Sequence, residues 1–269
     1  PWDLVVYGGT AGGVTAAVQA ARMGKRAVLV EPTRHIGGLT SGGLGMTDAG
    51  RREVIGGLSR EFYQRIKKHY EGETAWKQQK RSEYAHLKES EDALMRFEPK
   101  VAELVLRQML EEAKVAVVTG ERLDLKQGVV CNGPRIVRLV MESGRDFTGR
   151  MFIDATYEGD LMAKAGVSYT VGREANAQYG ETLNGVQVRR ATSHQFDKPV
   201  DPYVKAGDPS SGLLPGVHGG DPGKDGEADR RIQAYCFRMC LTDVPENRLP
   251  FVKPVGYDPA RYELFLRYI

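Results

Sequence analysis

The sequence has few cysteines, no long apolar run and little excess of charge. Three cysteines among 269 residues are too few for a disulfide framework. No apolar run approaches the ~20 residues that a membrane-spanning helix needs. The formal net charge is +3, with basic and acidic residues spread along the chain. We therefore expect no membrane span and no nucleic-acid partner.

The sequence begins at Pro1, without a Met. Because a leader can be removed on export, both a cytoplasmic and an exported location stay open. No group of His, Cys, Asp and Glu has metal-ligand spacing, so we expect no metal.

Glycine, in contrast, is abundant, with 32 residues. Residues 3–8 are expected to form a strand, because Leu4, Val5 and Val6 follow one another without alternation, which is typical of a buried parallel strand. A glycine turn with Gly8, Gly9, Gly12 and Gly13 comes next, and an alanine-rich helix over 13–25 leads to a second strand over 26–31. This order predicts a β-α-β unit whose crossover is right-handed.

The glycine turn after the first strand predicts a pyrophosphate site. Backbone N–H groups at the start of a helix can hold a phosphate if no side chain blocks the approach. Placing Gly9 and Gly12 at the last two glycines of G-x-G-x-x-G leaves Tyr7 at the first, so Gly8 would supply the turn instead. A side chain at Gly9 or Gly12 would then block the approach or the helix packing.

Glu31 ends the second strand about 20 residues after Gly12, as the dinucleotide fingerprint expects. Its carboxylate can accept hydrogen bonds from ribose hydroxyls and would repel a 2′-phosphate. Further glycines follow at positions 37, 38, 42 and 43. A nicotinamide dinucleotide does not need this second glycine-rich loop, whereas the longer flavin cofactor does, so the pattern favours FAD.

The rest of the chain predicts an α/β fold: a Rossmann-like FAD/NAD(P)-binding domain, with a parallel sheet and a β-meander crossover, plus a partial α+β substrate domain. We expect the FAD-binding domain over 1–50 and 98–170, a helical insertion over 51–97 and the partial substrate or cap domain over 171–269. Further elements are expected as helices over 54–70, 98–113 and 158–166, and as strands over 115–120, 122–125, 128–131, 136–141 and 150–156. The apolar faces of the first two helices would be Val54, Leu58, Phe62 and Ile66, and Val101, Leu104, Val105 and Met109.

Four segments resemble a known family: "VVYGGTAGGVTAA", "EPTRHIGGLTSGGLG", "FIDATYEGDLMAKAGVSYTVGRE" and "QAYCFRMCLTDVPENRLPF". The chain resembles the FAD-dependent oxidoreductases with a glutathione-reductase-like FAD domain, in the branch often labelled xanthan lyase. Nothing in the residues suggests polysaccharide elimination. The resemblance also implies that relatives continue beyond "LFLRYI" and return a segment to the FAD domain, so we expect a truncated chain.

The resemblance implies a role for each motif. The pyrophosphate would be held by Gly8, Gly9, Thr10, Ala11 and Gly12, and the adenosine ribose by Glu31. The cofactor would be lined further by Pro32, Arg34, Gly37, Gly38 and Leu39, with the Val117 backbone on adenine and with Ala155, Thr156 and Asp160 beside the nucleotide. Asp154 would brace its turn rather than touch substrate.

Several residues are candidates for a role in catalysis. His194 and His218 are candidate general bases, although surface histidines are commoner. Arg238 lies among apolar residues and would bind a substrate carboxylate or pair internally. Cys236 and Cys240 could form a redox pair on one helix face, although buried structural cysteines are commoner. His35 could hydrogen-bond the flavin or attach to it, but a packing role in the loop is favoured.

These features favour an FAD-dependent oxidoreductase that passes a hydride between a small molecule and the flavin, with a second, unknown electron acceptor. The family label hints at a carbohydrate-related substrate. The alternatives are an NAD-dependent dehydrogenase that uses the same turn, and a non-catalytic nucleotide-binding module.

Overall fold

In the computed structural model, residues 1–193, 195–233 and 237–269 are described. The chain divides into two units, which are treated separately below. The first comprises Pro1–Tyr169 with Cys236–Arg248, and the second Thr170–Tyr235 with Leu249–Ile269.

A six-stranded sheet in the order β3-β2-β1-β6-β5-β4 forms the centre of the first unit. Its strands are β1 (Trp2–Tyr7), β2 (Ala27–Glu31), β3 (Ala116–Thr119), β4 (Val129–Asn132), β5 (Arg135–Val140) and β6 (Asp146–Asp154). Strands β3, β2, β1 and β6 run parallel, and β5 and β4 continue the sheet antiparallel. The sequence therefore predicted the parallel sheet and the meander correctly.

One strand joins the two halves of the sheet. The first residues of β6 pair antiparallel with β5, from Asp146 to Thr148. Its later residues pair parallel with β1 as far as Asp154. The expected strand over 122–125 is wrong, because the structure has only an isolated bridge between Leu123 and Met141 there.

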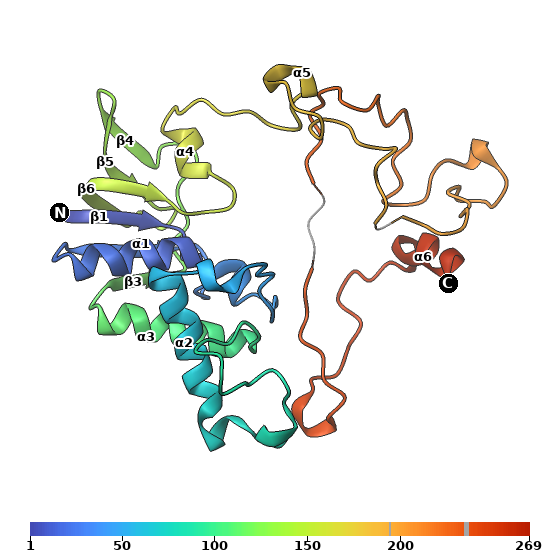
Figure 1. Ribbon diagram of the computed structural model, residues 1–269. Helices are drawn as coiled ribbons and strands as arrows, with labels where there is room; N and C mark the ends of the chain where they lie inside the picture. Colours follow the sequence, from blue (N-terminus) through green and yellow to red (C-terminus); the bar gives the residue numbers. More distant parts are fainter. Residues whose placement is uncertain (194, 234–236) are drawn as a thin grey trace. The chain divides into compact units, whose positions relative to one another are not determined.

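Two apolar cores cover opposite faces of the sheet, because alternate residues of β1 and β2 point to opposite sides. One core packs Leu4, Val6 and Leu29 against the helices. These are α1 (Ala11–Arg22), α2 (Gly57–Glu71) and α3 (Pro99–Glu112), which lie together beside the sheet (Figure 1). The other core packs Val5 and Val28 against residues of the meander and of α4 (Asp160–Lys164).

The helix faces differ from expectation at two positions. Leu104 of α3 is 43% exposed, and Val54 lies outside α2 and is 71% exposed. The contacts of α3 with the sheet and with α2 use Val101, Val105 and Met109. Leu104 lies outside this stripe, and α2 begins only at Gly57, three residues after Val54.

The remaining elements are short. The second unit contains α5 (Asn176–Tyr179) and α6 (Glu263–Tyr268), and Arg173 pairs there with Asp229. Within the described residues, the 3-10 turns are Gly38–Thr40, Arg52–Val54, Glu73–Ala75, Arg81–Glu83, Pro209–Ser211, Pro245–Asn247 and Pro259–Tyr262. Among the described residues, no helix is long and apolar enough to cross a bilayer.

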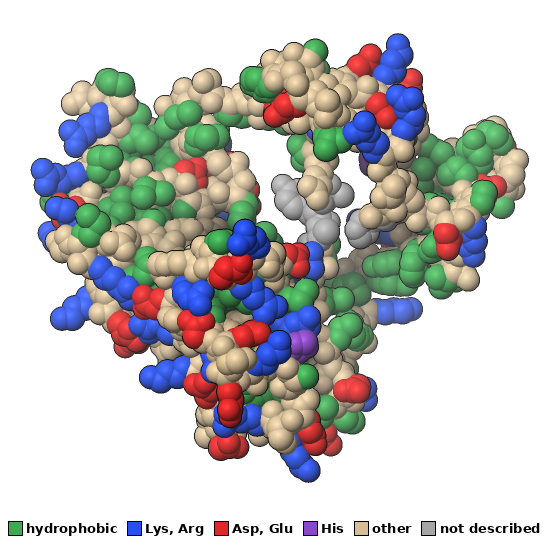
Figure 2. Space-filling model, viewed as in Figure 1, with side chains coloured by type: hydrophobic (Ala, Val, Ile, Leu, Met, Phe, Trp, Pro, Cys, Tyr) green, Lys and Arg blue, Asp and Glu red, His purple; other side chains and the backbone are tan. Residues whose placement is uncertain are grey.

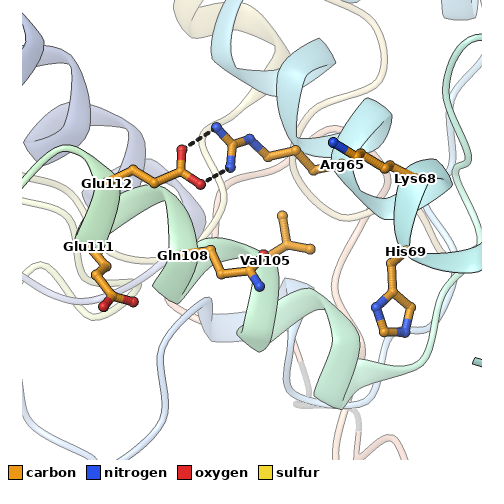
Figure 3. Close-up of a pocket in the computed structure, with 7 residues that line it drawn as sticks. All are labelled: Arg65, Lys68, His69, Val105, Gln108, Glu111 and Glu112. Carbon is orange, nitrogen blue, oxygen red and sulfur yellow. Dashed lines mark hydrogen bonds and ion pairs between the residues drawn. The ribbon is translucent and has the colours of Figure 1, made fainter. Parts of the chain in front are cut away.

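Ion pairs connect the three large helices on their outer side. Glu61 of α2 accepts hydrogen bonds from Arg22 of α1 at 2.6 and 2.8 Å, and from Arg65 at 3.0 Å. Arg65 in turn donates two hydrogen bonds to Glu112 of α3 at 2.7 and 2.6 Å (Figure 3). Figure 2 shows basic and acidic side chains interspersed over this part of the surface. The Arg22 guanidinium, with help from Arg65, lowers the pKa of Glu61 to about 2.

This network predicts an acid-dependent contribution to stability. Because the pKa of Glu61 is lower in the folded chain than the ordinary 4.5, its contribution is complete above pH ~4.5 and is lost as the pH falls toward 2. We expect Glu61→Gln to lower the free energy of unfolding by about 1–2 kcal/mol at pH 7, since it weakens a three-helix network. Urea titrations of both proteins at several pH values measure this difference.

Glu111→Gln is the matched control, because Glu111 is exposed on α3 and forms no ion pair within the described residues. We expect it to change the free energy of unfolding by less than ~0.5 kcal/mol. A loss from Glu61→Gln that stayed constant down to pH 2 would contradict the assignment to the carboxylate charge.

Candidate active site

A cavity of about 560 Å³ lies where β1, β2 and β6 end. The chain leaves β1 toward β2 and β3 on one side, and β6 pairs with β1 on the other. Open α/β sheets bind their ligands in the crevice at such a change of direction. The cavity is lined by Tyr7, Gly8, Thr10, Glu31, Pro32, Thr33, His35, Gly38, Ser41, Gly42, Arg122, Leu125, Thr156, Tyr157, Glu158 and Asp160.

The glycine turn has a different register from the one predicted. Gly8 has φ +105°, and an added Cβ would lie 2.7 Å from the carbonyl carbon of Ala155. An added Cβ at Gly13 would overlap the carbonyl oxygen of Gly8, whereas one at Gly12 would meet only Thr10 Oγ1, at 3.6 Å. Gly8 therefore makes the tight turn, as expected, but Gly13 rather than Gly12 allows the helix to pack against the strand. Tyr7 then precedes the motif instead of replacing its first glycine.

Thr10 stands at the second glycine position of G-x-G-x-x-G and is the N-cap of α1. Its Oγ1 donates to the carbonyl oxygen of Ala155 at 2.7 Å and accepts from the amide of Gly13 at 3.2 Å. The Gly12 amide, in the first turn of α1, has no hydrogen-bond partner among the described residues. A free amide at the start of a 12-residue helix is suited to donate to an anion.

Glu31 is buried, with 8% of its surface exposed, yet it lines the cavity. Its Oε2 accepts from the amide of Gly9 at 2.6 Å, and its Oε1 accepts from the amide of Thr33 at 2.7 Å. Each carboxylate oxygen can accept more than one hydrogen bond, so both can still accept a hydroxyl. The sequence predicted that Glu31 would approach the glycine turn, but it did not predict that the carboxylate holds the backbone of that turn.

The second glycine-rich loop lies directly against the first. The amide of Gly37 donates to the carbonyl oxygen of Gly9 at 2.6 Å. Gly37 has φ +113°, and an added Cβ would meet Leu106 of α3 at 2.7 Å. Gly38 has φ +56°, and an added Cβ would overlap the hydroxyl of Tyr157, which accepts from the amide of Leu39 at 2.8 Å. These glycines serve close packing of the protein on itself as well as access to the cavity.

Helix α3 holds the same loop from outside. Glu103 accepts from the amide of Ile36 at 3.2 Å and contacts His35 Nδ1 at 3.0 Å. Arg107 bonds Glu103 and donates to the carbonyl oxygen of Arg34 at 2.9 Å. Burial raises the pKa of Glu103, but the hydrogen bonds from His35, Arg107 and Ile36 outweigh it and lower the pKa overall. His35 itself lines the cavity, and its side chain is 82% exposed.

The turn after β6 is braced by Asp154. Its Oδ1 accepts from the amide and the hydroxyl of Thr156 at 2.9 and 2.7 Å, and its Oδ2 accepts from the amide of Met162 at 2.9 Å. The expectation that Asp154 braces the turn is confirmed.

The structure brings only part of the predicted cofactor set to the cavity. The residues that line it are Gly8, Thr10, Glu31, Pro32, Gly38, Thr156 and Asp160. The residues that do not are Gly9, Ala11, Gly12, Arg34, Gly37, Leu39, Val117 and Ala155. Sequence reasoning missed Tyr7, Thr33, Ser41, Arg122, Leu125, Tyr157 and Glu158 as lining residues, although Tyr157 and Glu158 belong to a motif that it singled out.

The catalytic candidates are not gathered at this cavity. His218 is exposed in the second unit. Arg238 is exposed and forms no ion pair within the ranges described, and its carbonyl oxygen lies against Gly43. His194 and Cys236 lie outside the described residues, and Cys240 is an exposed free thiol. No group of metal-ligating side chains occurs in the described part of the chain.

A second cavity, of about 630 Å³, lies between α2 and α3 (Figure 3). Its walls include Lys68, His69 and Gln108, and its Arg65 is already bonded to Glu61 and Glu112. It has no glycine turn or buried acid, so its chemistry does not suggest a cofactor site.

The first cavity fits a dinucleotide such as FAD. Gly8 and Thr10 of the glycine turn line it, the nearby Gly12 amide has no partner among the described residues and is suited to a phosphate, and the Glu31 carboxylate is suited to accept from a ribose hydroxyl. The fit rests on backbone and carboxylate groups that α3 and the turn after β6 hold in place.

Comparison with known proteins agrees with this fit. The family described as "FAD dependent oxidoreductase" matches residues 3–269. No curated protein matches the chain.

Similar solved structures include L-proline dehydrogenase from P. horikoshii, at 15% identity and TM-score 0.41, with 65% of this chain and 58% of that chain covered. THI4 from Thermovibrio ammonificans has 20% identity and TM-score 0.41, with 68% and 71% covered. Thioredoxin reductase from Lactococcus lactis has 16% identity and TM-score 0.35, with 58% and 35% covered. The chain thus spans 58% of the dehydrogenase and 35% of the reductase.

The match over residues 3–269 and the dinucleotide cavity at the ends of β1, β2 and β6 lead to the same result: the chain belongs to the FAD dependent oxidoreductase family, whose cofactor is FAD.

Proposed function

We propose that this chain holds FAD in the cavity at the ends of β1, β2 and β6 and acts in hydride transfer to or from a small molecule. The observation that carries the proposal is the position of Glu31. Its carboxylate is buried, lines the cavity and accepts the amide of Gly9 at 2.6 Å. A buried acid at the end of the second strand beside a glycine turn is suited to a ribose next to a pyrophosphate.

Each part of the cavity has one task in this proposal. The amides at the start of α1 bind the pyrophosphate, and Thr10 keeps that helix start against the turn after β6. Glu31 binds the adenosine ribose. FAD, when bound, supplies the ring that accepts or gives a hydride.

The second glycine-rich loop would orient the rest of the cofactor. Its backbone is held by Glu103 at Ile36 and by the Ser41 hydroxyl, which donates to the carbonyl oxygen of Ile36 at 2.5 Å. A loop fixed at several points can align a cofactor with little ordering cost on binding.

The substrate in this proposal is a small molecule, with carbohydrate-derived compounds as the first class to screen, and a second molecule serves as electron acceptor. The test is reconstitution of the purified 269-residue chain with FAD. Retained flavin absorbance after gel filtration supports the proposal. Binding of NAD without flavin, measured by fluorescence titration, would instead favour a nicotinamide-dependent dehydrogenase.

Removing the charge of Glu31 tests the ribose assignment. We expect Glu31→Gln to raise the dissociation constant of FAD by about 10-fold or more, because charged acceptors form stronger hydrogen bonds with hydroxyls. Quenching of flavin fluorescence measures this constant. Glu142→Gln is the control, because Glu142 is exposed and does not line the cavity. Equal affinities for wild type and Glu31→Gln would contradict the assignment.

The glycines of α1 allow a second comparison. Gly13→Ala places a methyl group on the carbonyl oxygen of Gly8, so we expect a loss of stability of about 2 kcal/mol or more. Gly12→Ala meets no close protein atom, so we expect it to fold normally and to bind FAD at least about 10-fold more weakly, because the methyl group occupies space meant for the phosphates. Thermal melting and FAD titration separate the two effects. Tight FAD binding by Gly12→Ala would show that the pyrophosphate lies elsewhere.

A further inference from the structure

The segment after β3 brings a cation to the adenosine end of the cavity. The amide of Gly120 donates to the carbonyl oxygen of Thr33 at 2.8 Å, and the amide of Glu121 donates to that of Glu31 at 3.1 Å. These two hydrogen bonds place the next residue, Arg122, beside the turn that carries the ribose-binding acid. Arg122 and Leu125 both line the cavity.

The guanidinium of Arg122 is available to a ligand. It forms no ion pair or side-chain hydrogen bond within residues 1–193, 195–233 and 237–269, although Glu31, Glu158 and Asp160 line the same cavity. Its neighbour Glu121 is instead paired with Arg145 and bonded by Ser143.

A buried tyrosine fixes the backbone of this segment. The hydroxyl of Tyr7 accepts from the amide of Leu123 at 2.9 Å, across 116 positions of the sequence. Tyr7 is 3% exposed and Leu123 is fully buried. Burial raises the pKa of Tyr7, so the phenol stays protonated near neutral pH. The segment is therefore held from β1, directly before the glycine turn.

We propose that Arg122 is the specificity-determining residue for the adenine base of FAD, with the guanidinium stacked on the ring, and that Tyr7 is its positioning residue. This inference rests on the proposed function. A planar guanidinium stacks well on aromatic faces, and the exposed edge of Leu125 supplies an apolar neighbour for the base. A phosphate is not the expected partner of Arg122. In the proposed function the pyrophosphate binds at the start of α1, and the carboxylate of Glu31 would repel a 2′-phosphate.

Nucleoside diphosphates test the base contact directly, because ADP and UDP differ only in the base. For the wild-type chain we expect ADP to bind more tightly than UDP. We expect Arg122→Ala to raise the dissociation constant of ADP about 10-fold and that of UDP much less, since stacking of a cation on an aromatic ring is lost. Arg122→Lys should lose most of the same preference, because lysine keeps the charge but not the plane.

Two further variants test whether the ADP preference depends on a positive charge anywhere in this segment and on the position in which Tyr7 holds the segment. Lys126→Ala removes a cation from the same connection without touching the cavity, so it should leave the ADP preference unchanged. Tyr7→Phe removes the acceptor for the Leu123 amide and should reduce the ADP-over-UDP ratio about 3- to 10-fold. Thermal melting shows whether Tyr7→Phe folds, and Arg122→Ala decides the inference if it does not.

The outcomes distinguish this inference from the proposed function. A wild-type chain that binds neither FAD nor ADP overturns both. A chain that binds FAD, and whose ADP-over-UDP ratio is the same in Arg122→Ala, overturns only the role of Arg122. Tighter binding of 2′,5′-ADP than of ADP would also overturn it, because Arg122 would then pair with a phosphate.

Discussion

The hydrogen bond from the Gly9 amide to the buried carboxylate of Glu31 is the interaction on which the cavity depends. It joins the turn after β1 to the turn after β2 at 2.6 Å. A buried carboxylate without partners would be costly, so the amides of Gly9 and Thr33 both stabilise it there. The same acid thus fixes two turns of the protein and lines the cavity in which we propose that FAD binds.

The sheet brings three turns to this point because its strands end together. β1 pairs in parallel with β2 and with β6, so the residues after all three strands meet at one edge. β6 can serve this edge only because its first residues already pair with the meander. The meander also supports the opposite face of the sheet with its own apolar core. The same strand, β6, therefore joins the meander to the sheet and brings its own end to the cavity.

The helical layer contacts the second glycine-rich loop of the site. Glu103 on α3 holds the loop at Ile36, and Leu106 packs against Gly37. The ion pairs of Glu61 and Arg65 join α3 to α2 and α1 on the outer side. The helix that contacts this loop is thus itself joined to the other two large helices.

Local patterns in the sequence were sufficient for the β-α-β unit, the parallel sheet, the meander, Glu31 at the second strand end and the bracing role of Asp154. Each depends on apolar runs, glycines and spacing within a short stretch of chain, or on a motif of the family. The register of the glycine turn was decided by tertiary structure, because an added Cβ at Gly13, but not at Gly12, would meet the carbonyl oxygen of Gly8 and the side chain of Ala155. Arg122 and Tyr7 also required the fold, since their link spans 116 positions. Long-range backbone contacts leave no periodic signal in a single sequence, and for that reason only the folded chain reveals them.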